Sequence, residues 1–399
     1  MKSACLHLYL CLCFQILTGF NYLFNGAEAF STSSSAAAAG LRLQPTSISI
    51  SISTSKSQSI KQTRGASRRA QSSTSLNVAA AVPVVATATA MALPSAKAIL
   101  ATTLLPTCLG YYRYEYGVSY GYGTATALTA FLTLRSLLAN PTFTAGSFAC
   151  MAQLHALAIV FYGVRLNAFL LFREAFIPRF RKMRETIEDR QRVKEVDTGL
   201  IGKFINRTPF ILSCAVLYAG LASSPLISAK LIAMGNGYSP TCKIGLMVYK
   251  ALVGTTYFGF LLGAIGDLTK TVVKGRKGSD HLVTGGVFSI FRHPNYTGEV
   301  IGWVSSFLAS LVAVMSVVMT GTGTGTAGIN KLSMVKEFGP LLALSFAGVL
   351  GIAFVLFAAA SNLEKRQKEK YGDDEIYAKW IASSWSGPKL KQSKPVGKE

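Results

Sequence analysis

The chain has 399 residues, of which half are hydrophobic and only 15% are charged, and its mean hydropathy is +0.37. A soluble domain normally carries about 25% charged residues, so this composition excludes an ordinary soluble protein and indicates several membrane-spanning helices. The formal net charge of +22 is compatible with nucleic-acid binding, but the basic residues gather beside apolar segments, as the positive flanks of membrane helices do. We therefore expect a lipid bilayer as the partner, no nucleic acid, and no obligate protein partner.

The first 76 residues have the composition of a targeting leader in two parts. Lys2 precedes an apolar stretch that ends in Ala27-Glu28-Ala29, the small-x-small pattern of a secretory cleavage site, which predicts a signal peptide over residues 1–29. Residues 30–76 are rich in Ser, Thr, Ala and Arg and contain no Asp or Glu, as is typical of transit peptides.

Phe30 directly after the predicted cleavage site resembles the bipartite leaders of algae with secondary plastids. That resemblance implies a plastid membrane as the location. The alternative is a secretory signal followed by a disordered linker, which would place the protein in the endoplasmic reticulum membrane.

Beyond the leader, six or seven apolar segments are long enough to cross a bilayer. The predicted fold class is therefore all-α, a polytopic membrane bundle. We divide it into an N-terminal transmembrane region over 77–240, a C-terminal catalytic region over 241–385 and a basic tail over 386–399. The predicted spans are 78–105, 122–138, 145–164, 209–234, 244–265, 300–319 and 338–360.

Loop charge predicts the sidedness of this bundle. Lys and Arg cluster in residues 173–207, 270–292 and 365–370, and two predicted spans separate each cluster from the next. All three clusters therefore fall on one face, which the positive-inside rule assigns to the cytosol or stroma.

Three other patterns are better explained by structure than by a site. The seven cysteines show no C-x-x-C and no histidine spacing, so we predict neither a disulfide framework nor a metal site. The G-x-G-x-x-G match at 323–328 lies in a Thr-Gly-rich connector without a strand–helix unit. His155, within an apolar segment, is interpreted as a packed core residue.

The densest group of polar side chains lies where a loop enters the span 300–319. Residues 292–299 read Arg-His-Pro-Asn-Tyr-Thr-Gly-Glu. Pro294 fits the first turn of a helix, where its missing N–H costs nothing. Asn295, Glu299 and Gly302 then fall at i, i+4 and i+7 on one helix face.

The residue types in this segment suit an anionic ligand. Arg292 and His293 carry charge that matches phosphate. Glu299, inside a membrane helix, must be neutral, paired with a cation or bound to a ligand. Tyr296 lies on the neighbouring stripe, and Gly298 is small enough for a ligand or another helix to approach.

A second polar group closes the preceding span. Asp267, Lys270 and Lys274 are spaced at i, i+3 and i+7, which places them on one helix face. The two lysines could hold a diphosphate while Asp267 accepts from ribose or amide donors. The alternative is that these side chains snorkel to the membrane interface.

Two further elements accompany these groups. Tyr162-Gly163-Val164-Arg165 closes the third span, and we interpret Arg165 and Arg173 as snorkelling to headgroups rather than reaching into the site. Residues 364–385 contain tyrosines and tryptophans among charges, which predicts an interfacial helix over the site with its aromatic rings at headgroup level.

The spacing Gly-x-Phe, Arg-His-Pro-Asn-Tyr-x-Gly-Glu and then Trp resembles the C-terminal domain of the steroid 5-alpha-reductase and sterol-reductase superfamily, in a poorly characterised Arg-His-Pro-Asn-Tyr branch. The resemblance covers residues 162–380, with Gly-x-Arg-Leu and Asp-x-x-Lys upstream as in that branch. It implies a bundle that binds NADPH from the basic face and transfers a hydride to a C=C bond of a sterol, isoprenoid, carotenoid or fatty-acyl substrate. The implied cofactor-binding residues are Asp267, Lys270, Lys274, Arg292, His293 and Asn295, and the implied catalytic residues are Tyr296 and Glu299.

One competing family shares the Arg-His-Pro core. The isoprenylcysteine and phospholipid methyltransferases use S-adenosylmethionine. Their pattern favours a second Glu pair after the last span, preceded by Arg, which Glu364 and Arg366 match only in part. The Asn-Tyr-x-Gly-Glu completion and the upstream Asp-x-x-Lys favour the reductase. A membrane protein without turnover is a third hypothesis, which the intact polar set disfavours.

Overall fold

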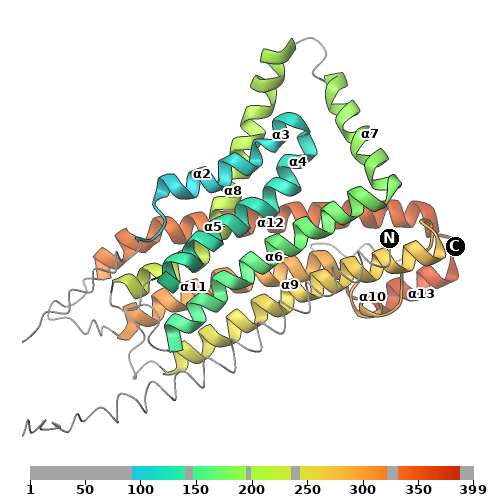
Figure 1. The fold of residues 1–399 in the computed structure, drawn as a ribbon. Coiled ribbons are helices and arrows are strands. Elements are labelled where there is room, and N and C mark those ends of the chain that lie inside the picture. The colour runs from blue at the N-terminus through green and yellow to red at the C-terminus, as the bar shows by residue number, and fades with distance from the viewer. Residues whose placement is uncertain (1–91, 140–146, 195–198, 235–242, 321–330, 387–399) are drawn as a thin grey trace, which may run out of the picture. The chain divides into compact units, whose positions relative to one another are not determined.

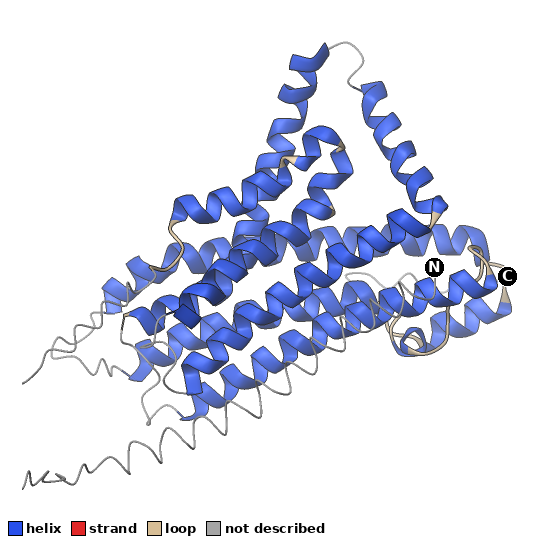
Figure 2. Cartoon of the chain, viewed as in Figure 1, coloured by secondary structure: helices blue, strands red, loops and turns tan. Residues whose placement is uncertain are grey.

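The computed structural model describes residues 92–139, 147–194, 199–234, 243–320 and 331–386. The predicted leader (1–76), the first half of the first predicted span and all but the first residue of the basic tail lie outside these residues. Within them the chain forms helices joined by short loops and contains no strand (Figure 2). The predicted all-α membrane bundle is confirmed. The helices are α2 (Ala96–Thr107), α3 (Leu109–Tyr112), α4 (Tyr114–Val118), α5 (Tyr120–Ala139), α6 (Ser147–Phe176), α7 (Pro178–Lys194), α8 (Gly199–Ala233), α9 (Lys243–Lys277), α10 (Val287–Ile290), α11 (Pro294–Thr320), α12 (Lys331–Tyr371) and α13 (Glu375–Ser383).

Five of the described helices, α6, α8, α9, α11 and α12, are long and apolar enough to cross a membrane, which makes the chain an integral membrane protein. The predicted span 122–138 does form a helix, α5, but its threonines and Arg135 keep it below the apolar composition of the other five. The described end of the predicted span 78–105 belongs to α2, which has only 12 residues and is capped by Ser95.

Glycines bring the backbones of α9 and α11 into direct contact. A Cβ atom at Gly259 would lie 2.6 Å from the carbonyl oxygen of Gly298, and one at Gly266 would lie 2.8 Å from the amide nitrogen of Asn295. Such small-residue seams are how membrane helices approach closely. Because α9 and α11 are antiparallel and pack along this seam (Figure 1), their polar ends meet.

Parts of the three segments with high Lys and Arg content meet at one end of the bundle. Arg179 of α7 donates to the Ser279 carbonyl oxygen at 3.3 Å. Asp280, in the same α9–α10 connection, forms an ion pair with Lys370 near the end of α12. These contacts join α7, the α9–α10 connection and α12 at what we call the basic end.

The C-terminal helix α13 packs against the α9–α10 connection. Tyr377 and Trp380 are each only 5% exposed and pack with Val283 and Phe288, and the Trp380 Nε1–H donates to the Phe288 carbonyl oxygen at 2.6 Å. The prediction that these rings lie at headgroup level was therefore wrong for Tyr377 and Trp380, because they complete a small protein core. Trp385, 48% exposed, is the described tryptophan of the segment that does reach the surface.

Candidate functional site

A cavity of about 310 Å³ opens at the basic end. Five of the six predicted cofactor-binding residues line it, namely Lys270, Lys274, Arg292, His293 and Asn295. Arg179, Arg366 and Lys370 add three more cations, and none of the described residues lining the cavity is Asp or Glu. Arg292 and Lys370 are paired with Glu364 and Asp280. The other four Lys and Arg side chains still make a positive field, which attracts anionic ligands and is the chemistry that phosphate requires.

Two of the cations share a carbonyl oxygen in the cavity wall. Lys274 donates to the Ser279 carbonyl at 2.9 Å and Arg179 donates to the same oxygen at 3.3 Å. Lys270 lies one turn deeper on the same face of α9, as its spacing predicts. Arg179 was not among the predicted site residues, because nothing in the spacing of α7 indicates that its first turn reaches α9.

Arg292 lines the cavity but directs its donors into the protein. Its Nη1 lies 3.2 Å from Glu364, its Nη2 donates to the Ile381 carbonyl at 3.1 Å, and its Nε donates to the Ser384 hydroxyl at 3.3 Å. The backbone continues this attachment, since the amide of Arg292 donates to the Trp385 carbonyl at 2.8 Å. Arg292 therefore holds the C-terminal segment as one wall of the cavity.

His293 is 3% exposed, and its Nε2 lies 3.5 Å from the same Glu364 carboxylate. Glu364 thus contacts both predicted phosphate ligands of the Arg-His-Pro segment and neutralises Arg292. The positive charge left facing the cavity comes mainly from α7, α9 and α12.

Beneath the cavity lies a buried polar layer. Arg165 of α6 is 1% exposed and its Nη1 lies 2.9 Å from the carboxylate of Asp267. A Cβ atom at Gly263 would lie 3.6 Å from Arg165 Nη2 and 3.8 Å from Glu299 Cγ. Glu299 itself is 8% exposed. The interpretation of Arg165 as a snorkelling side chain was therefore wrong, because it forms the centre of this layer between two carboxylates.

Tyr162 and Tyr296 complete the buried polar layer. Tyr162 is fully buried beside Glu299. Tyr296 is partly buried between His293, whose ring centroid lies 6.0 Å away, and the Arg173 side chain. Below them Trp303 donates from Nε1 to the Tyr122 hydroxyl at 2.6 Å, which begins the apolar part of the bundle.

The cavity and the buried polar layer are neighbours along both helices. A helix rises about 1.5 Å per residue, so Asp267 lies only about 5 Å along the axis of α9 from Lys270. Asn295, in the cavity wall, lies about 6 Å along α11 from Glu299. A ligand anchored in the cavity needs to extend by only one helical turn to reach the carboxylates.

Comparison with known proteins gives one family. The model described as "Protein of unknown function (DUF1295)" matches residues 126–339, and this family is linked to steroid 5-alpha-reductase-like membrane proteins. Neither the curated proteins nor the solved structures give a match. The matched stretch includes the polar ends of α6, α9 and α11, which contribute the buried polar layer, but ends before Arg366 and Lys370 of α12.

Proposed function

The chain belongs to the DUF1295 family, whose function is unknown, and we propose that it is a membrane oxidoreductase that transfers a hydride from NADPH to a C=C bond of a lipophilic substrate. One observation carries the proposal: a cavity lined by six Lys and Arg side chains directly adjoins a buried layer of carboxylates and a tyrosine hydroxyl.

The charge of the cavity fits NADPH. This cofactor carries a diphosphate and a 2′-phosphate, and the cavity presents cations without a lining carboxylate. Lys270, Lys274, Arg179 and Arg366 would hold the phosphates, with Asn295 as a hydrogen-bonding partner. Ligand pockets span roughly 300–1000 Å³, so a cavity of about 310 Å³ accounts for the phosphate-bearing part of the dinucleotide.

The buried polar layer supplies what reduction of a C=C bond needs besides a hydride. NADPH, when bound, supplies the hydride, and the chain must supply a proton and polarise the conjugated group of the substrate. Glu299 and Tyr162 are the proton-donating candidates because both are buried and adjacent. Arg165 and Asp267 orient Glu299 from the side, and Tyr296 remains a candidate at the boundary with the cavity.

S-adenosylmethionine is the alternative cofactor. The observation in its favour is Glu364, which forms contacts with both Arg292 and His293 and matches the second Glu expected of the methyltransferases. Against it, S-adenosylmethionine has no phosphate and carries a cationic sulfonium, which Arg179, Lys270, Lys274 and Arg366 in the cavity wall would repel. The charge balance of the cavity therefore favours NADPH.

Thermal stability in detergent separates the candidates. Ligand binding to the folded state stabilises it by about 2.7 kcal/mol at a hundredfold excess over the dissociation constant. We expect NADPH to raise the Tm, and to raise it more than NADH does, whereas S-adenosylmethionine should leave it unchanged. Protection by S-adenosylmethionine alone would establish the methyltransferase, and protection by neither would favour a protein without turnover.

A matched pair of variants locates the binding. Lys270→Met removes a partly buried cation of the cavity, and Lys277→Met removes an exposed cation from the end of the same helix. NADPH should protect the Lys277 variant as it protects the unmodified protein and should protect the Lys270 variant much less. Equal protection of both would refute the placement of the cofactor.

The plastid location is part of this proposal and is supported by the composition of residues 30–76. Sequencing the N-terminus of the mature protein tests it. A mature chain that begins near residue 77 supports the transit segment, whereas one that begins at Phe30 refutes it.

A further inference from the structure

A second cavity, of about 210 Å³, lies between α7 and the turn that joins α3 to α4. Tyr112 and Arg113 line it from that turn, and four side chains line it from α7: Glu185, Glu188, Asp189 and Arg192. The four are spaced at i, i+3, i+4 and i+7 and so share one helix face. Unlike the cavity at the basic end, this one mixes three carboxylates with two guanidinium groups.

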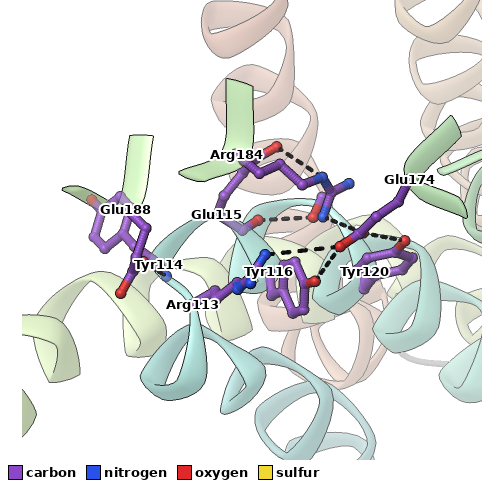
Figure 3. Close-up of polar contacts among 9 residues, drawn as sticks. Arg113, Tyr114, Glu115, Tyr116, Tyr120, Glu174, Arg184 and Glu188 are labelled. Atoms are coloured by element: carbon purple, nitrogen blue, oxygen red, sulfur yellow. Dashed lines mark hydrogen bonds and ion pairs between the residues drawn. The ribbon is translucent and has the colours of Figure 1, made fainter. Parts of the chain in front are cut away.

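Part of this second cavity is held rigidly (Figure 3). Glu188 is 7% exposed and accepts hydrogen bonds from the Tyr114 amide at 3.0 Å and from Arg207 Nη2 at 2.9 Å. The guanidinium of Arg113 lies 5.8 Å from the ring centroid of Tyr112 and 5.5 Å from that of Tyr116. Glu185, Asp189 and Arg192 complete the wall from the exposed side of α7.

Contacts to α6 place the second cavity at the membrane–water boundary. Glu174, in the last turn of α6, accepts from the hydroxyls of Tyr116 at 2.5 Å and Tyr120 at 2.8 Å. Arg184 of α7 lies 3.0 Å from the same carboxylate. The end of a spanning helix, ringed by tyrosines and arginines, is the depth at which lipid headgroups lie.

An exposed apolar stripe leads from the second cavity toward the hydrocarbon. Leu105, Leu109 and Tyr112 are 71%, 41% and 68% exposed and are spaced at i, i+4 and i+7. The spacing holds across the α2–α3 junction because Cys108 keeps helical backbone angles. Since Thr102 contacts Thr129 of the antiparallel α5 at 2.8 Å, the stripe descends along the bundle from the headgroup level.

We propose that this corner binds one zwitterionic phospholipid. Its cationic amine lies against Glu185 and Asp189, its phosphate lies against Arg113 and Arg192, and one acyl chain follows the stripe from Tyr112 to Leu105. Because Glu188 is already paired with Arg207, two carboxylates and two guanidinium groups remain for the headgroup. This balance matches a zwitterion better than a headgroup with net negative charge. A soluble zwitterion would match the charges but would leave the apolar stripe unused.

Lipid retention measured by native mass spectrometry tests this. The purified full chain is mixed with equal amounts of phosphatidylethanolamine and phosphatidylglycerol that have identical acyl chains, with phosphatidylcholine in a parallel sample. We expect a 1:1 adduct with either zwitterionic lipid, several-fold more abundant than the phosphatidylglycerol adduct. Equal retention of the zwitterionic and anionic lipids would overturn the proposal.

Two sets of variants assign the adduct to this corner. The double variant Glu185→Gln/Asp189→Asn removes only exposed carboxylates and should lose the preference for the zwitterionic lipid, whereas the exposed control Asp373→Asn should keep it. Leu105→Ser/Leu109→Ser should lower retention of all three lipids. Unchanged retention in the carboxylate variant would overturn the site, and this readout is independent of any effect of NADPH.

Discussion

The pair formed by Arg165 and Asp267 allows the sharpest test of the buried polar layer. Asp267→Asn leaves the guanidinium of Arg165, 1% exposed, without its partner at 2.9 Å. Removing one member of a buried pair costs about 3–5 kcal/mol because it leaves an uncompensated charge away from water. In domains of 150–250 residues, 1 kcal/mol shifts the Tm by about 2–4 °C, so the expected loss is about 6–20 °C.

The chain contains a matched control for this variant. Lys379 and Glu375 form an ion pair at 2.7 Å on α13, but their side chains are 75% and 80% exposed. Exposed pairs contribute about 0.2–1 kcal/mol, so Lys379→Met should lower the Tm by only a few degrees at most. Both variants are measured by thermal unfolding in the same detergent, with ligand absent.

Glu299 sets the size of the effect. It lies near Arg165, and the double variant Asp267→Asn/Glu299→Gln leaves Arg165 without either neighbouring carboxyl group. This double variant should be less stable than Asp267→Asn alone. If Asp267→Asn destabilises no more than Lys379→Met does, the buried pair is not a stabilising contact of the folded protein and our reasoning about this layer is wrong.

Three other predictions follow from single contacts. Gly259→Ala should destabilise the protein by several kcal/mol, because its Cβ would lie 2.6 Å from the Gly298 carbonyl, whereas Gly254→Ala on the same helix meets nothing within 4 Å and should stabilise it by about 0.5–1 kcal/mol; equal Tm values for the two would contradict the seam between α9 and α11. Arg292→Lys should leave the spanning helices intact but expose the C-terminal segment to protease, since its contacts to Ile381 and Ser384 are lost; unchanged cleavage would show that α13 is held by other contacts. Burial raises the pKa of Glu188, but hydrogen bonds from the Tyr114 amide and Arg207 outweigh it, so the folded-state pKa lies below the ordinary 4.5. Its stabilising contribution is therefore present above pH 4.5 and lost as the pH falls through the folded-state pKa, so the Tm of Glu188→Gln should fall less between pH 6 and pH 3 than that of the exposed control Glu369→Gln.

Helical periodicity was enough to predict part of the lining of the cavity at the basic end. Spacing placed Lys270 and Lys274 on one face of α9 and Asn295 at the start of α11, and all three line that cavity. The same spacing predicted that Asp267 and Glu299 lie at the ends of two consecutive spans. What spacing cannot provide is the partner of each side chain, because partners come from helices that are distant in sequence.

Arg165 and Arg292 both show this limit, because Arg165 was predicted to lie outside the site and Arg292 was predicted to bind phosphate. An arginine near the end of a span snorkels in most membrane helices, so Arg165 gave no signal that its partner lies 102 residues later. Arg292, next to His293 and Pro294, has the residue type and position of a phosphate ligand, yet its donors are used by backbone carbonyls of α13. The sequence therefore shows which polar residue types are present, but only packing determines which of them face a ligand.

Depth in the membrane explains why the proposed site is divided in two. Phosphates are strongly hydrated and are best held where cations meet water, whereas a lipophilic substrate remains in the hydrocarbon and can reach the protein only below the headgroups. A group that donates a proton to such a substrate must therefore lie below the phosphate site but within the reach of one cofactor molecule. Glu299, about 6 Å along α11 from Asn295, meets this requirement, and the nearby Arg165 lowers the cost of burying it there.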